Sequence, residues 1–147
     1  MSGRLIKVLS TLIVLLATPS VSCAGTVLIT EREARLPQEH LEASPRAITR
    51  GPRIELIQPS ETAYSPMHFQ LKFQSFGGSS INTESLRVIY LKTPEIDITL
   101  RVARFVRPAG IDIPDAEAPV GEHHIRVDVT DSEGRTRSTV FTLKIAP

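Results

Sequence analysis

Two adjacent histidines followed by three acidic residues form the densest group of potential metal ligands in the chain. His123 and His124 precede Asp128, Asp131 and Glu133 in the stretch GEHHIRVDVTDSEGR. Imidazole and carboxylate groups are the side chains that bind zinc, copper and calcium in proteins. The question is whether this stretch is a metal site or a strand that runs into a turn.

The pattern of the stretch favours a strand, because aliphatic and polar residues alternate along it. Consecutive side chains of a strand point to opposite faces, so His123 and His124 cannot easily coordinate the same metal ion. On the outward face, Arg126 stands between His124 and Asp128, where its positive charge would oppose a bound cation. We interpret the alternation as the first strand of a hairpin.

The acidic end of the stretch has the composition of a turn. Asp131 can accept hydrogen bonds from downstream amides, and Gly134 can adopt a positive φ angle. An EF-hand loop would need a longer run of alternating oxygen ligands that ends in Glu, and none follows. A turn is therefore expected, with a weak calcium site as the alternative, and we expect the imidazoles and acids to lie on the solvent side or in bends.

Other candidate chemistry is sparse. The sequence places no base beside Ser79 and Ser80, which lie in a turn-like stretch, and His68 falls on the polar face of a predicted strand. Asp112 and Asp115 could in principle act as an acid and a base, but solvated loop acids are commoner. No nucleophile elbow, phosphate-binding loop, zinc-protease motif or paired-cysteine motif occurs. We assign no catalytic, cofactor-binding or metal-binding residues, no cofactor, and no enzymatic activity.

Length and composition predict one loop-rich β domain. The chain has 147 residues, of which 41% are hydrophobic, with 11 prolines, 8 glycines and no tryptophan. Lysine and arginine number 17 against 16 acidic residues, so no broad positive field exists to hold a polyanion. Nucleic acid is not expected as a partner.

The first residues have the form of a signal peptide. Arg4 and Lys7 precede a mostly apolar run that is too short to span a bilayer, and Ser22 and Ala24 are small residues that suit cleavage before Gly25. We therefore predict a signal peptide over residues 1–24 and a periplasmic or secreted protein, with no transmembrane anchor after cleavage.

Cys23 is the only cysteine and lies at this boundary. Our interpretation is that it leaves with the signal peptide; the alternative is a lipoprotein signal, in which Cys23 is acylated and becomes a lipid anchor. No disulfide can form within the chain in either case, so the exported fold must depend on its hydrophobic core.

Residues 25–52 are predicted to be a leader to the domain, because they show no sustained apolar period. Thr30 and Glu33 have the spacing of a capping box, which predicts a short helix. The stretch 26–29 is apolar enough to add a strand to a sheet edge as an alternative to docking or flexibility.

Residues 53–147 are predicted to form the domain. Apolar and polar residues alternate strictly over 67–74, and strands are also expected at 53–56 and 86–91 and in a hairpin over 121–145. Short strands are predicted at 95–99 and 110–114, while 100–106 fits a strand or a helical turn. The apolar positions of the clear strands make up the predicted core: Ile54, Leu56, Met67, Phe69, Leu71, Phe73, Leu86, Val88, Tyr90, Ile125, Val127, Val129, Phe141, Leu143 and Ile145.

The stretch 52–145 resembles bacterial immunoglobulin-like (fibronectin-like) exported β-sandwich domains. The resemblance is carried by GEHHIRVDVTDSEGR, which looks like their closing hairpin, and by INTESLRVIYL at 81–91. The fold class that it implies is an all-β, immunoglobulin-like antiparallel sandwich, preceded by the signal peptide and the leader.

The resemblance implies a non-enzymatic binding module with a protein or glycan partner. The alternative is a periplasmic carrier of a ligand or metal, calcium or copper, because periplasmic copper-resistance sandwiches are similar in size and export. Their ligands include a histidine at the mature N-terminus, where this sequence has Gly25.

Overall fold

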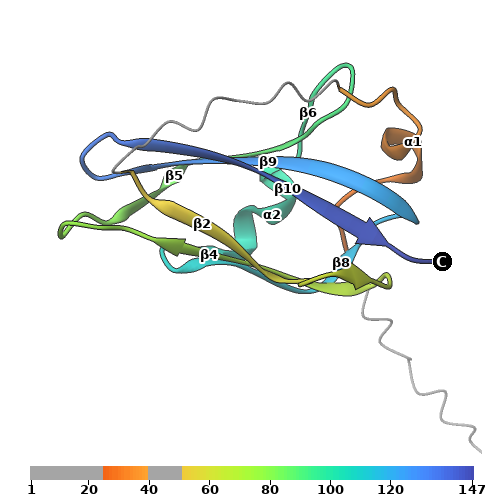
Figure 1. The fold of residues 1–147 in the computed structure, drawn as a ribbon, viewed down its shortest axis with the longest axis horizontal. Helices are drawn as coiled ribbons and strands as arrows, with labels where there is room; N and C mark the ends of the chain where they lie inside the picture. Colours follow the sequence, from red (N-terminus) through yellow and green to blue (C-terminus); the bar gives the residue numbers. More distant parts are fainter. Residues whose placement is uncertain (1–24, 40–50) are drawn as a thin grey trace, which may run out of the picture.

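The computed structural model describes residues 25–39 and 51–147, which form an all-β protein of two packed sheets (Figure 1). The all-β, two-sheet part of the prediction is confirmed. The predicted signal peptide, Cys23 and residues 40–50 of the predicted leader lie outside the described residues.

The first sheet has the strand order β1-β8-β4-β2, with β7 added to β8. Its strands are β1 (Thr26–Val27), β2 (Arg53–Gln58), β4 (Met67–Gln74), β7 (Val106–Arg107) and β8 (Gly110–Glu117). Its pairings are antiparallel except that of β1 with β8, which is parallel. The sheet thus joins the amino-terminal segment to the middle of the chain.

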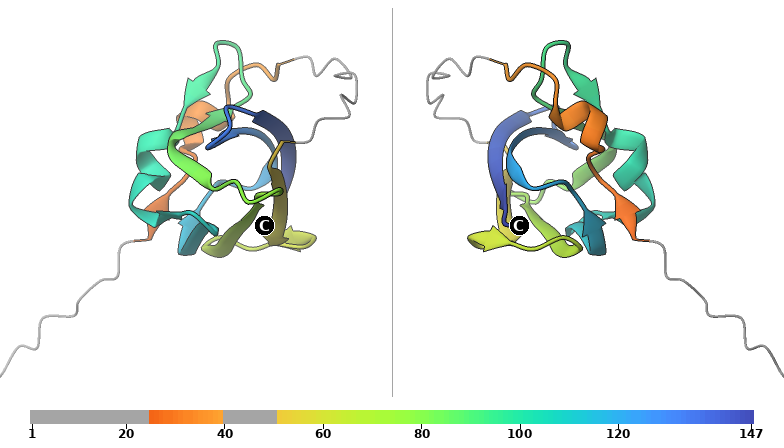
Figure 2. Two further views of the ribbon diagram at one scale, coloured as in Figure 1. Left: turned by 90° about the vertical axis from the view of Figure 1, so that its left-hand side faces the viewer. Right: turned by 90° about the vertical axis from the view of Figure 1, so that its right-hand side faces the viewer.

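The second sheet has the order β3-β10-β9-β5-β6 and covers the first (Figures 1 and 2). Its strands are β3 (Thr62–Ala63), β5 (Ile81–Tyr90), β6 (Ile96–Asp97), β9 (Gly121–Asp131) and β10 (Thr136–Ile145). The predicted hairpin is β9 and β10, paired without a break from Thr130 opposite Thr136 to Gly121 opposite Ile145.

The alternation of β4 is confirmed residue by residue. Met67, Phe69, Leu71 and Phe73 are buried, while His68 faces outward. A period of two places every second side chain on the inner face, where it packs against the facing sheet. The predicted core is buried throughout except for two half-buried members that pack against it, Leu56 and Phe141.

The middle of the chain, where periodicity does not decide between strand and helix, contains the short strands β6 and β7, two short helices between them, and then β8. After β6 the chain forms α2 (Thr99–Val102) and the 3-10 helix η1 (Ala103–Phe105), so the alternative of a helical turn is correct for 100–105. The Asp97 carboxylate accepts a 2.8 Å hydrogen bond from the Thr99 amide, and this local bond ends the strand. The strand predicted at 110–114 is confirmed and extends to Glu117.

The amino-terminal segment packs along one side of the sandwich. The capping box is confirmed: the Glu33 amide donates to Thr30 Oγ1, the Thr30 amide donates to the Glu33 carboxylate, and α1 (Glu31–Ala34) follows. Leu28 and Ile29 belong to the hydrophobic core. The alternative that the stretch 26–29 adds a strand to a sheet edge is correct for β1, which pairs with β8. None of the helices within residues 25–39 and 51–147 has the length and apolar character to cross a membrane.

The guanidinium of Arg101 fixes this segment against α2. It donates to the Leu28 carbonyl at 3.0 Å and makes two bonds to the Glu33 carboxylate, at 2.8 and 2.5 Å. The bonds to Arg101 lower the pKa of Glu33 to about 2, although partial burial acts in the opposite direction. A charged, two-point contact of this kind gives the docked segment one orientation.

Candidate functional site

The two histidines of the opening motif lie on opposite faces of β9, as predicted, but the expectation that both are solvated is wrong. His123 is only 2% exposed and shares the inner face with Ile125 and Val127. The alternation along β9 places position 123 on the inner face with Ile125 and Val127. The prediction of a solvated His123 was wrong because it followed the polarity of the side chain and not this alternation.

Two hydrogen bonds satisfy the buried imidazole. The carbonyl oxygen of Pro119 lies 2.7 Å from Nε2 of His123 and can only accept, so Nε2 carries the proton. Nδ1 of the neutral ring then accepts from the Tyr90 hydroxyl at 2.9 Å. Burial lowers the pKa of His123 below its usual value, and the charge of Lys92 acts in the same direction. Burial also raises the pKa of Tyr90 to about 12. This pair is therefore neutral and structural.

The outward face of β9 carries a ladder of polar contacts. His124 Nδ1 lies 3.0 Å from Thr142 Oγ1, and the guanidinium of Arg126 contacts Glu95 at 2.7 Å and Asp128 at 3.4 Å. Arg126, which the sequence places between His124 and Asp128, thus contacts the Asp128 carboxylate. Among the described residues no group of three or more histidine, cysteine or acidic side chains is arranged to hold a metal ion.

The predicted turn at Asp131 is confirmed, but its carboxylate is buried rather than solvated. It accepts the amides of Glu133 and Arg135, both at 3.0 Å, and the Arg135 guanidinium at 2.8 Å. Burial raises the pKa of Asp131, but these hydrogen bonds outweigh it and hold the pKa below its usual range. Ser79 joins the same network, with Oγ 3.3 Å from the Asp131 carboxylate. The network ties two turns together, and Gly134, at φ 76°, lets the second turn close.

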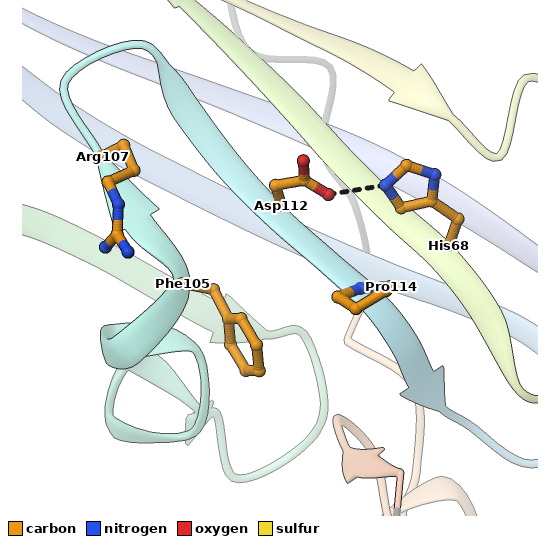
Figure 3. Close-up of a pocket in the computed structure, with 5 residues that line it drawn as sticks. All are labelled: His68, Phe105, Arg107, Asp112 and Pro114. Carbon is orange, nitrogen blue, oxygen red and sulfur yellow. Dashed lines mark hydrogen bonds and ion pairs between the residues drawn. The ribbon is translucent and has the colours of Figure 1, made fainter.

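A different group of residues, from two regions of the chain, surrounds a surface hollow of about 520 Å³ (Figure 3). We call it the β4–β8 hollow. It is lined by His68 from β4, Asp112 and Pro114 from β8, Phe105 from η1 and Arg107 from β7.

His68 and Asp112 form the polar centre of the hollow. Their side chains meet at 2.6 Å, His68 Nε2 to Asp112 Oδ1, because Asp112 lies opposite Gln70 in the β4–β8 pairing and both side chains point outward. The side chains are 47% and 60% exposed, so a ligand can reach both. The Asp112 carboxylate, which the sequence suggests as an acid or base together with Asp115, thus pairs with an imidazole.

Phe105 and Arg107 form the other side of the hollow. Phe105 is half-buried against the core, and the Arg104 guanidinium lies 4.6 Å from its ring centre. The Arg107 side chain is held by the backbone just before it, since Nη1 donates to the carbonyls of Val106 at 3.0 Å and Arg104 at 3.4 Å. The rest of its guanidinium remains available for an acceptor.

Sequence reasoning missed this site. His68 and Asp112 are 44 positions apart, and only the register of β4 against β8 brings them together. A signal existed, because both positions are polar and fall on outward faces of predicted strands. The five side chains that line the hollow offer a carboxylate, an imidazole, a guanidinium and apolar surface, but, over the lining that the structure describes, no hydroxyl or thiol nucleophile. The arrangement is suited to hydrogen bonding and stacking.

The chain was compared with models of known protein families, with curated proteins and with solved structures, and none of the three comparisons found a match.

Proposed function

We propose that the chain is an exported, immunoglobulin-like, non-enzymatic interaction module that binds a protein or glycan partner in the periplasm or outside the cell. Export rests on the signal-peptide features of residues 1–24. The strand order supports the immunoglobulin-like assignment. β2, β4 and β8 lie in the order of strands A, B and E of such domains, and β5, β9 and β10 in the order of C, F and G.

The observation that carries the binding role is the β4–β8 hollow. Binding sites combine apolar surface with a few polar groups that fix the ligand's orientation. Here Phe105 and Pro114 supply the apolar surface, while Arg107, His68 and Asp112 supply donors and acceptors.

The chemistry of the hollow favours a glycan within this proposal. A sugar ring has hydroxyl groups at its edges, which both donate and accept, and C–H groups on its faces. The Asp112 carboxylate accepts from hydroxyls and the Arg107 guanidinium donates to them, as charge-assisted hydrogen bonds. The part of the Phe105 ring that lines the hollow, and that neither the core nor Arg104 covers, offers apolar surface for the C–H groups.

A glycan array probed with the exported, purified protein tests the proposal, followed by calorimetry with the best sugar. We expect Arg107→Ala and Asp112→Asn each to weaken binding at least about tenfold, since each removes charge-assisted hydrogen bonds of roughly 1.5 to 3 kcal/mol. Lys72→Ala is the matched control, because Lys72 is exposed on the outward side of β4 and does not line the hollow.

Equal binding by the three variants would refute the hollow as the site. Calorimetric titration with calcium, copper and zinc tests the carrier alternative, which requires tight, stoichiometric uptake. A protein partner remains the outcome if no sugar binds and cross-linking in the periplasm gives a complex that Arg107→Ala abolishes.

A further inference from the structure

The side chain of Glu117 lies directly against the backbone of Gly25. A β-carbon built on Gly25 would be 2.3 Å from Oε1 of Glu117 and 2.9 Å from its Cγ and Cδ atoms. Real β-carbons do not approach other atoms so closely, so the carboxylate occupies the space that a side chain at position 25 would need. The first described residue of the chain is thus covered by an acidic group.

The pairing of β1 with β8 fixes this approach. Val27 lies opposite Glu117 in the parallel ladder, and the Glu117 carbonyl accepts the amides of Leu28 at 2.9 Å and Ile29 at 3.3 Å. Leu28 and Ile29 are both buried in the core. The backbone around Gly25 and Glu117 is therefore held by hydrogen bonds and by apolar packing.

We propose that Glu117 is the docking site for the α-ammonium group that is created at Gly25 when the bond between Ala24 and Gly25 is cleaved. The inference rests on the proposed export and is independent of the β4–β8 hollow. Cleavage is a hydrolysis: water adds across the amide bond, Ala24 keeps the new carboxylate, and the nitrogen of Gly25 becomes an amine that takes up a proton. A neutral amide is thereby replaced by a cation beside a carboxylate.

The geometry allows the contact. The amide nitrogen and the built β-carbon are bonded to the same Cα, so a carboxylate oxygen 2.3 Å from the latter lies at most about 5 Å from the nitrogen. Rotation of the flexible Glu117 side chain can close the rest of this distance. A side chain at position 25 would require the flexible Glu117 carboxylate to move aside.

Charged groups of both signs surround this contact. Glu117 and Glu31 line a second hollow of about 350 Å³, between the amino-terminal segment and the end of β8, and no lysine or arginine lines it. Two cations lie nearby: Arg35 pairs with Glu31 at 3.9 Å, and the Arg104 guanidinium donates to Thr26 Oγ1 at 2.7 Å. Within the described residues neither of them, nor any other cationic side chain, makes an ion pair with Glu117. The α-ammonium group would supply the missing positive charge.

The test begins with the full chain expressed in a host that exports it, and with the intact mass and amino-terminal sequence of the purified protein. We expect the mature chain to start at Gly25. The pKa of its α-amino group is then measured by NMR after reductive ¹³C-methylation. In the wild type we expect a value at least half a unit above the ordinary range of about 7.7 to 8.0, because the carboxylate stabilises the charged form.

Glu117→Gln should return the α-amino pKa to the ordinary range, whereas Asp115→Asn, a charge-removing control on the same strand, should leave it raised. A mature chain that starts elsewhere, including at an acylated Cys23, would overturn both the cleavage and the docking. A start at Gly25 with an ordinary pKa, or with a raised pKa that Glu117→Gln does not change, would overturn the docking alone. Loss of ligand binding at the β4–β8 hollow would have no bearing on either result.

Discussion

The Tyr90 hydroxyl donates a 2.9 Å hydrogen bond to Nδ1 of His123 on the inner face of the second sheet. The other ring nitrogen donates to the Pro119 carbonyl, which lies in the connection between β8 and β9. A polar chain in the core therefore links β5 to the segment that crosses from one sheet to the other. Buried networks of this kind specify one arrangement only when each member is satisfied.

Tyr90→Phe should lower the free energy of unfolding by about 1 to 3 kcal/mol, because it leaves Nδ1 of His123 buried without a donor. Urea unfolding at pH 7.5 measures the effect. Tyr64→Phe is the matched control, since Tyr64 is 70% exposed, and it should have almost no effect. Equal stability of both variants would show that the bond contributes nothing.

The stability of the protein should fall as the pH drops below about 6.5, before the carboxylates titrate. The folded-state pKa of His123 lies below its unfolded value, so the unfolded state binds more protons in the interval between them, and stability there rises with pH. Protonation would put a second donor on the ring, facing the Tyr90 hydroxyl.

Urea midpoints at pH 8 and pH 5.5 measure this loss. His123→Gln should remove most of the difference between the two pH values, whereas His124→Gln, on the outward face, should retain it. A wild-type midpoint that does not change over this interval would contradict the prediction.

Leu71→Ala should cost roughly 2 to 5 kcal/mol, because Leu71 is 2% exposed in the core and its truncation leaves a cavity. Gln70→Ala, at the neighbouring outward position of β4, should cost far less. Denaturant melts of the two variants are the measurement, and similar losses would contradict the register of this strand.

Glu33→Gln should destabilise the protein by about 1 to 3 kcal/mol at pH 7, because it removes charge-assisted bonds to Arg101. The folded-state pKa of Glu33 is about 2, below its usual 4.5, so its contribution is present above about pH 4.5 and is lost as the pH falls toward 2. The gap between wild type and variant should therefore shrink across that range. Glu31→Gln, at an exposed carboxylate in the same helix, should show no such gap.

Local rules predicted the elements whose cause lies within a few residues. Two-residue alternation predicted the buried face of β4. The same alternation, with the turn at Asp131-Ser132-Glu133-Gly134, predicted the hairpin of β9 and β10. The capping box of Thr30 and Glu33 closes within one helical turn. Each of these depends on neighbours in the chain, so the printed sequence contains the information.

Where polarity and periodicity disagreed, periodicity was the better guide. His123 and Asp131 share the parity of Ile125 and Val127, and both are buried despite their polar side chains. Each has hydrogen-bond partners that compensate for the loss of water. One of those partners, Tyr90, lies on another strand, so the compensation was not visible in the local sequence.

The sequence by itself determined the all-β class, the inward faces of the strands and the short capped helix, because these follow from local periodicity and local hydrogen bonds. Only the tertiary structure decided that His68 lies beside Asp112, that Arg101 holds Glu33, and that Glu117 covers Gly25. These pairs are separated by 44 to 92 positions, and their contacts depend on which strands become neighbours and in which register. That choice is made by the packing of the whole core, and no short window of sequence contains it.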